Sequence, residues 1–138
     1  MHTTTMRHAR RAVAALALAV LAATPAVAGA TDDIVIEPTG LRRPLHRTAV
    51  ERPVTWVNRS GVPAHIEFVG RPGEHRVFQV PGSIWAVFHR PGLHPYVVHL
   101  EGSRRAELRG SVQVIFDEGT VRASTCDGIT VREVCIDP

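Results

Sequence analysis

The chain has 138 residues, with sixteen Arg, no Lys and thirteen Asp and Glu, and its formal net charge is +3. Arg7, Arg10 and Arg11 precede every acidic residue, so sixteen minus three leaves thirteen Arg against thirteen acids from Thr31 onward. This part of the chain has no net charge, so it lacks the overall basic character that nucleic-acid binding requires. We therefore predict no nucleic-acid partner, and the length suits a single domain.

Residues 1–30 have the three parts of a secretory signal peptide. A polar, basic segment over residues 1–11 precedes twelve apolar residues, 12–23, and the small-x-small sequence A-V-A at residues 26–28 fits a cleavage site, with A-G-A at residues 28–30 as the second choice. Twelve residues rise about 18 Å in a helix, whereas the hydrocarbon core of a membrane is roughly 30 Å thick. We therefore expect an exported protein, periplasmic or secreted, with no membrane span.

After the signal peptide, short apolar runs alternate with Pro and Gly, a pattern typical of β-strands joined by turns. In one run, Val54 and Trp56 fall on one face of a strand, and Thr55 and Val57 fall on the other. The pattern predicts an all-β domain, either a sandwich or a small barrel. The predicted strands cover residues 34–36, 53–58, 65–69, 75–80, 84–88, 93–100 and 110–116.

Three other segments have different interpretations. Residues 41–52 are polar and rich in Arg, which predicts a connection that runs over the surface. Residues 104–108 are the one candidate for a helical turn. Asp127-Gly128 is a strong hairpin dipeptide, so we expect a further pair of strands on either side of it.

Two cysteines, Cys126 and Cys135, lie close together in the sequence. An exported protein can form disulfides, and a bridge here would close a loop of about ten residues, worth roughly 2–3 kcal/mol. The alternative is a dithiol metal or redox site, but the spacing does not fit a C-x-x-C pattern. We predict the structural disulfide.

Three segments resemble the plastocyanin- and amicyanin-like cupredoxins. Residues 54–65, with V-T-W-V-N and G-V-P-A-H, resemble the segment that supplies the first copper histidine. Residues 88–96, F-H-R-P-G-L-H-P-Y, resemble the F-x-x-P-G-x-Y-x-Y strand, and residues 108–114 resemble the closing M-x-G-x-V-x-V. The resemblance implies an all-β, Greek-key β-sandwich of the cupredoxin type over residues 31–117, followed by a C-terminal tail over residues 118–138.

The same resemblance implies a type 1 copper site, which needs two His, a Cys thiolate and a weak axial Met. His65 takes the place of the first histidine, although one extra residue separates it from Pro63. The Cys position falls on Val98, the second His position on Glu101 and the Met position on Leu108. We therefore predict that the domain lacks the blue-copper ligand set and is not a blue-copper electron carrier.

A remodelled metal site remains an alternative. His65, His99 and Glu101 offer two imidazoles and a carboxylate, which suit Cu(II), or Zn(II) in a tetrahedral geometry. Apart from copper at such a site, we predict no cofactor. By spacing, His46, His75 and His89 are interpreted as surface or strand-edge residues without partners.

Two functions follow from these observations. The first is an exported binding or structural module, with a protein partner at the loop around Glu101–Leu108. The alternative is a periplasmic copper-binding protein that uses the His/Glu site. The sequence contains no nucleophile-elbow, P-loop or H-E-x-x-H motif, and we predict that the protein is not an enzyme.

Overall fold

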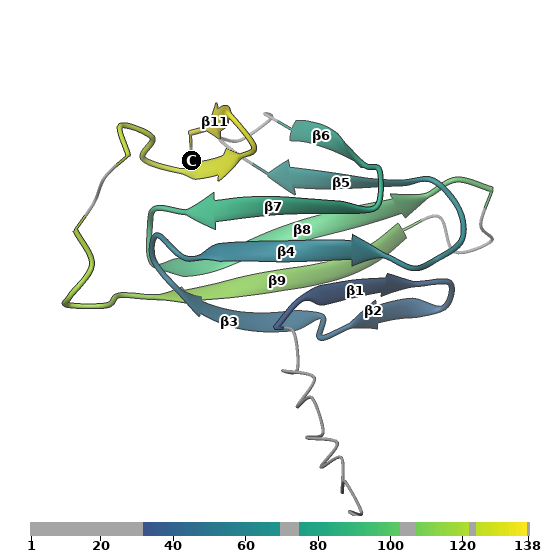
Figure 1. Ribbon diagram of the computed structural model, residues 1–138, viewed down its shortest axis with the longest axis horizontal. Coiled ribbons are helices and arrows are strands. Elements are labelled where there is room, and N and C mark those ends of the chain that lie inside the picture. The colour runs from purple at the N-terminus through teal and green to yellow at the C-terminus, as the bar shows by residue number, and fades with distance from the viewer. Residues whose placement is uncertain (1–31, 70–74, 103–106, 122–123, 138) are drawn as a thin grey trace, which may run out of the picture.

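The computed structural model of the chain describes residues 32–69, 75–102, 107–121 and 124–137, so the predicted signal peptide lies outside the described residues. The described residues form eleven β-strands and no helix, which confirms the all-β prediction (Figure 1). Within these residues, accordingly, no helix is long and apolar enough to span a membrane. The strands are β1 (Ile34–Glu37), β2 (Gly40–Arg42), β3 (Leu45–Ala49), β4 (Pro53–Asn58), β5 (Ala64–Val69), β6 (His75–Val80), β7 (Ser83–Phe88), β8 (Gly92–Leu100), β9 (Glu107–Ile115), β10 (Ile129–Val131) and β11 (Val134–Ile136).

The strands form two sheets that pack face to face as a sandwich (Figure 1). The six-stranded sheet has the order β11-β10-β7-β4-β1-β2, and the five-stranded sheet has the order β3-β9-β8-β5-β6. β4 and β7 are antiparallel neighbours, although β5 and β6, which separate them in the sequence, form a hairpin in the other sheet. The chain therefore crosses between the sheets before and after this hairpin, which is the connectivity of a Greek key and confirms the predicted topology.

The core lies between the sheets because side chains alternate along each strand. On β4, Val54 and Trp56 are at most 1% exposed, and on β5 the same holds for Ile66 and Phe68. The residues between them face outward and are partly exposed. The largest fully buried side chains are Trp56, Tyr96, Phe68, Phe88, Ile34, Ile36, Ile66 and Ile136.

Trp56 and Tyr96 occupy the centre of the core, with ring centroids 5.3 Å apart in an edge-to-face contact. Burial raises the pKa of Tyr96 to about 12. Among the described residues, neither its hydroxyl nor the indole nitrogen of Trp56 has a hydrogen-bond partner. Tyr96 pairs directly with Gly110 across β8 and β9, and a Cβ at Gly110 would overlap the tyrosine ring. The missing side chain at Gly110 therefore makes room for the ring.

Residues 41–52 were predicted to form a surface connection, and this was wrong. Within them, β2 pairs with β1, and β3 pairs in parallel with β9 at the edge of the five-stranded sheet. An edge strand such as β3 places few side chains in the core, and along it only His46 is buried, at 5% exposed. The apolar pattern that reveals other strands is therefore missing here. Of the candidate helical turn, residues 104–106 lie outside the described part, and residues 107–108 begin β9.

The hairpin of β10 and β11 extends the six-stranded sheet, because β10 pairs antiparallel with β7. Its turn lies at Arg132 and Glu133, and Arg132 has a positive φ of 54°. A turn at Asp127-Gly128 was therefore the wrong prediction, since this dipeptide precedes β10. A non-Gly residue in the left-handed region is uncommon, which explains why the sequence did not reveal the turn.

Candidate functional site

The outer face of the five-stranded sheet carries a cluster of imidazole and carboxylate side chains. On β5, His65 and Glu67 alternate with buried residues and therefore point away from the core. β8 places His99 directly opposite His65, and the edge strand β6 begins with His75. Three neighbouring strands thus bring four side chains that can bind metals to one face.

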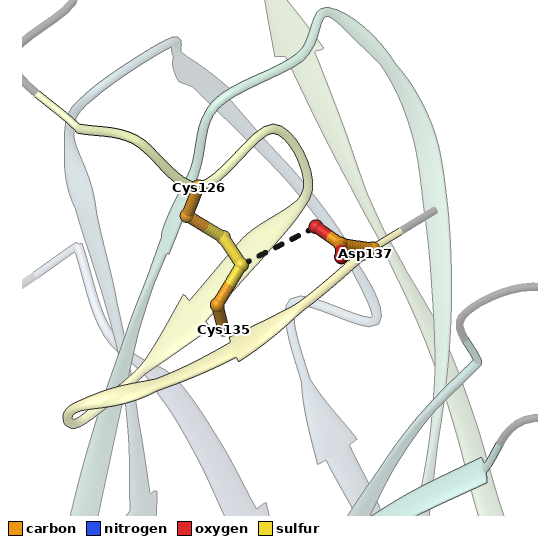
Figure 2. Close-up of side chains that lie close together, drawn as sticks. All are labelled: Cys126, Cys135 and Asp137. Carbon is orange, nitrogen blue, oxygen red and sulfur yellow. Dashed lines mark hydrogen bonds between the residues drawn. A yellow bond between two sulfur atoms is a disulfide. The ribbon is translucent and has the colours of Figure 1, made fainter.

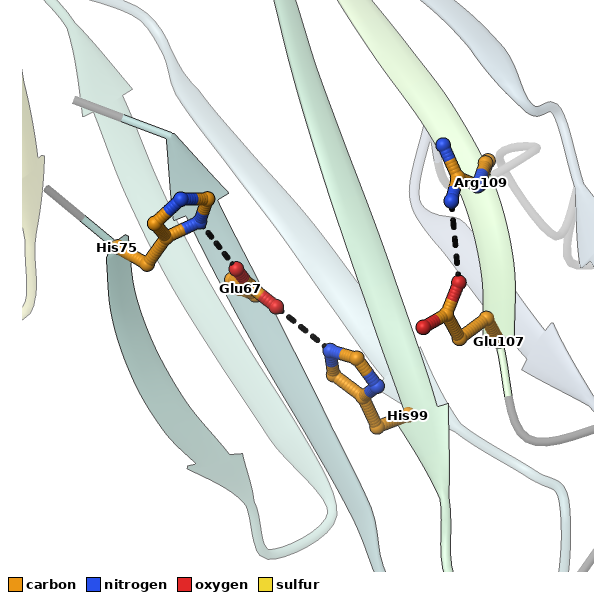
Figure 3. Close-up of polar contacts among 5 residues, drawn as sticks. All are labelled: Glu67, His75, His99, Glu107 and Arg109. Carbon is orange, nitrogen blue, oxygen red and sulfur yellow. Dashed lines mark hydrogen bonds and ion pairs between the residues drawn. The ribbon is translucent and has the colours of Figure 1, made fainter. Parts of the chain in front are cut away.

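Glu67 joins two of these imidazoles through its two carboxylate oxygens (Figure 3). Its Oε1 lies 2.5 Å from His75 Nδ1, and its Oε2 lies 2.7 Å from His99 Nε2. The side chain of Glu67 is 18% exposed, whereas those of His75 and His99 are 53% and 36% exposed. The carboxylate is therefore held between two imidazoles that remain open to solvent.

These contacts stabilise the charged carboxylate. The hydrogen bond from His99 is the main cause that lowers the pKa of Glu67, the hydrogen bond from His75 adds to it, and burial opposes both. Glu67 is therefore anionic at neutral pH, with an imidazole N–H donating to each oxygen. On the neighbouring β9, Arg109 Nη2 and Glu107 Oε2 form an exposed ion pair at 3.1 Å (Figure 3).

The three predicted metal-binding residues are divided between two contacts. His65 Nδ1 and Glu101 Oε1 lie 3.8 Å apart, and both side chains are partly exposed. His99 is the cross-strand neighbour of His65, but its Nε2 contacts Glu67. The structure therefore places all three residues in one region without directing them at a single point.

Sequence reasoning missed Glu67 and His75. The available signal for Glu67 was its place two residues after His65, since strand alternation puts these two side chains on the same face. His75 was interpreted as a residue without a partner, which was wrong. Its contact with Glu67 is diagonal across β5 and β6, and it follows from a register that the sequence does not reveal, in which Val69 pairs with His75 and Glu67 with Val77.

The positions that the resemblance assigns to copper ligands are distributed over both faces of the sheet. Val98 and Leu108 are 0% and 7% exposed and belong to the core. His65, by contrast, points to the outer face. Ala64, the residue that directly follows Pro63, is 0% exposed and faces the core.

The structure contains the predicted disulfide between Cys126 and Cys135 (Figure 2). Asp137 Oδ1 lies 3.4 Å from Cys135 Sγ. Among the described residues, these three form the one group whose ligand-type atoms all lie within 4.8 Å of one another. Because the sulfurs of Cys126 and Cys135 are bonded to each other, neither is available as a thiolate ligand.

Two histidines that were predicted to lie at the surface or at a strand edge are buried: His46, described above, and His89, which is 4% exposed. His89 Nδ1 lies 2.8 Å from Glu51 Oε1, and its Nε2 lies 2.7 Å from Thr130 Oγ1. The carboxylate of Glu51 accepts the hydrogen bond from Nδ1, and the hydroxyl of Thr130 can donate to Nε2 or accept from it. The prediction failed because both partners are distant in the sequence. The contacts connect the segment before β4, the end of β7, and β10.

No known protein family matches the sequence, and no curated protein matches it. Solved structures similar to the chain include a reduced amicyanin variant, with 22% identity over 59% of this chain and 79% of that chain and a TM-score of 0.46. An oxidised amicyanin variant has the same identity and coverage and a TM-score of 0.48. A purple cupredoxin from Nitrosopumilus maritimus has 22% identity over 60% of this chain and 98% of that chain, with a TM-score of 0.46. Similarities at this level support no conclusion about a copper centre or a function.

Proposed function

We propose that this protein is an exported, cupredoxin-type domain that carries no electrons through a type 1 copper centre and serves as a non-enzymatic binding or structural module. The observation that carries the proposal is the apolar packing of Val98 and Leu108 at the positions of the thiolate and the thioether. A type 1 centre depends on a thiolate ligand, and a buried Val cannot replace it.

The orientation of His65 supports the same proposal. One extra residue, Ala64, separates it from Pro63, and a shift of one residue in a strand moves a side chain to the opposite face. His65 accordingly points outward, whereas Val98 points into the core. A ligand at position 98 and the imidazole of His65 would face opposite sides of one sheet and could not bind the same ion.

The cysteines give further support. Cys126 and Cys135 are the two cysteines of the chain, and both belong to the disulfide. Cys135 lies on β11 in the six-stranded sheet, while Val98 lies on β8 in the five-stranded sheet. The disulfide and the signal-like residues 1–30 both favour a periplasmic or secreted location.

As a partner we propose another protein that contacts the loop between β8 and β9, around Glu101–Leu108. Residues 103–106 of this loop lie outside the described part. The described residues at its two ends are charged and exposed: the side chains of Glu101, Glu107 and Arg109 are 60%, 46% and 78% exposed. Such a surface suits a polar, reversible contact.

A second candidate function is copper handling through His65, Glu101 and His99. The observation that favours it is the 3.8 Å approach of His65 to Glu101, beside the cross-strand neighbour His99. Two imidazoles and a carboxylate can bind Cu(II) without a thiolate.

Addition of Cu(II) to the purified protein tests the first proposal. We expect no intense absorption at roughly 600 nm, because no thiolate can reach a bound ion. A strong blue band would refute the proposal. Metal analysis of protein isolated from its native compartment, followed by Cu(II) titration of wild type and His65→Ala, tests the second candidate. Stoichiometric copper that is lost in the variant would support it, whereas no bound metal and no change in stability with Cu(II) would exclude it.

A further inference from the structure

The outer face of the five-stranded sheet also carries exposed apolar side chains. Ten large apolar side chains of the described residues are exposed, and five of these lie on this face. Strand alternation directs the five away from the core, at 40% to 64% exposed: Leu45, Val69, Val77, Leu93 and Ile115. The exposed Pro95 lies among them on β8. Contiguous apolar surface of this kind marks an interaction site.

Charged residues lie on both sides of β8, the central strand of this sheet (Figure 3). Val97 on β8 pairs with Arg109 of β9 on one side and with Glu67 of β5 on the other. The next outward-facing position of β8 lies between Glu107 of β9 and His65 of β5. At each of these two levels, the group on one side of β8 is therefore complementary to the group on the other side.

We propose that this face is the interface of a dimer of two copies of the chain, related by a two-fold axis that runs close to the direction of β8. Such an axis places the β9 side of one copy over the β5 side of the other. Arg109 then faces Glu67 of the second copy, and Glu107 faces His65 of the second copy. Each contact occurs twice, and the apolar residues of β8 face their own equivalents. This inference goes beyond the proposed function and does not depend on it.

The contacts within one copy leave Arg109 and Glu67 able to pair with a second copy. The side chain of Arg109 is 78% exposed, and its Nη2 contacts Glu107 at 3.1 Å. A guanidinium has five N–H donors, so donors remain for another carboxylate. Each oxygen of Glu67 contacts one imidazole and keeps a further acceptor site.

The shapes of the two sides of β8 also match. A hollow of about 370 Å³ lies on the β9 side, and its lining includes Pro44, Pro95 and Ser111. On the other side of β8, the register of β5 and β8 places Val69 level with Pro95. The two-fold axis therefore brings Val69 of the second copy over this hollow, where its side chain, 40% exposed in one copy, becomes buried.

The size of the face suits a dimer. Five strands about 4.8 Å apart and roughly 20–30 Å long give a face of roughly 500–700 Å², before the relief of the side chains is counted. Stable interfaces bury about 600–1,000 Å² per partner. Sheets that pack face to face cross at about 30°, which displaces residues on β5 and β9 by roughly 2–3 Å. The long side chains of Arg109 and Glu67 can span this distance.

Sedimentation equilibrium of the exported, untagged protein, from roughly 1 µM to roughly 1 mM, tests the proposal. We expect a reversible equilibrium between monomer and dimer. Leu93→Glu places two carboxylates near the axis and should weaken association by at least about 10-fold. Val134→Glu is the matched control, because Val134 is 44% exposed but lies on β11 in the other sheet. It should change the association constant by less than about twofold.

Charge reversal at two positions tests the direction of the axis. Arg109→Glu and Glu67→Arg each place like charges opposite one another in a dimer of a single variant, so each should weaken association by at least about 10-fold. An equimolar mixture of the two variants should dimerise as the wild type does, because each reversed residue then faces an opposite charge. Mixing could not recover a variant that fails to fold, so recovery also shows that both variants are folded.

A protein that stays monomeric over the whole concentration range would overturn the inference. So would a dimer that persists in Leu93→Glu, or a mixture of the two charge variants that dimerises no better than either variant alone. None of these results bears on the proposed lack of a type 1 copper centre, which the Cu(II) absorption tests separately.

Discussion

Replacement of Gly110 by Ala tests how closely Tyr96 packs against β9. The added Cβ would overlap the hydroxyl oxygen and Cζ of Tyr96, and it would lie 2.9 Å from the carbonyl oxygen of Pro44. The ring of Tyr96 is 1% exposed and contacts Trp56 at its edge, so it has little room to move away. We therefore expect Gly110→Ala to destabilise the fold strongly.

The expected loss of unfolding free energy follows from the number of groups that must move. Overpacking in a core usually costs about 1–3 kcal/mol, and we expect about 3 kcal/mol because a buried ring and a backbone carbonyl would both be displaced. For a domain of this size, 1 kcal/mol lowers Tm by roughly 4–8 °C, so the expected drop is roughly 12–24 °C. Gly110 does not have a positive φ, so the backbone itself would accept Ala. The loss of stability therefore reports the overlap.

Thermal unfolding followed by circular dichroism measures this effect, and Gly40→Ala is the matched control. Gly40 also lies in a strand without a positive φ, but a Cβ there meets nothing within 4 Å. We expect no loss of Tm in the control. Combining Gly110→Ala with Tyr96→Leu should cost less than the sum of the two single changes. A drop in Tm below about 4 °C for Gly110→Ala would refute the reasoning, because the ring would then have room to move.

Two other predictions concern stability. Replacement of both Cys126 and Cys135 by Ala should lower the free energy of unfolding by about 2–3 kcal/mol in urea denaturation. Equal urea midpoints for oxidised wild type and the double variant would contradict this expectation. Burial lowers the pKa of His46 below its ordinary 6.5, so the unfolded state binds a proton that the native state binds less well. The stability from neutral His46 is complete above about pH 6.5 and is lost as the pH falls through the native pKa. Between about pH 8 and 5, Tm should therefore fall less in His46→Gln than in wild type. If the Tm of wild type and that of His46→Gln change by the same amount over this pH range, His46 makes no such contribution.

The strands with one fully buried face could be predicted from the sequence. In β4 and β5, large apolar residues such as Trp56 and Phe68 recur at every second position, because one face meets the core and the other does not. The edge strand β3 could not be recognised in this way. Its one buried side chain is His46, and the residues that it pairs with on β9 lie far along the chain: Leu45 pairs with Ser111, 111 minus 45 or 66 positions later.

In the candidate site, too, some features could be predicted from the sequence and others could not. Residue type and alternation indicate that His65 and His99 can serve as ligands, and both lie on the outer face. Their contacts depend on strand register, and a sequence without a known register cannot show that Glu67 reaches both His75 and His99. The expectation for His89 failed for a similar reason, because Glu51 and Thr130 approach it only in the folded sandwich.

The pairing of β10 with β7 makes the six-stranded sheet depend on the last strands that the structure describes. β7 ends at Phe88 and β10 begins at Ile129, 129 minus 88 or 41 residues later. Until the β10–β11 hairpin pairs with β7, the hydrogen-bonding groups along the outer edge of β7 are open to strands of other chains. A chain that has folded as far as β9 but has not yet docked this hairpin is therefore the form most vulnerable to intermolecular pairing.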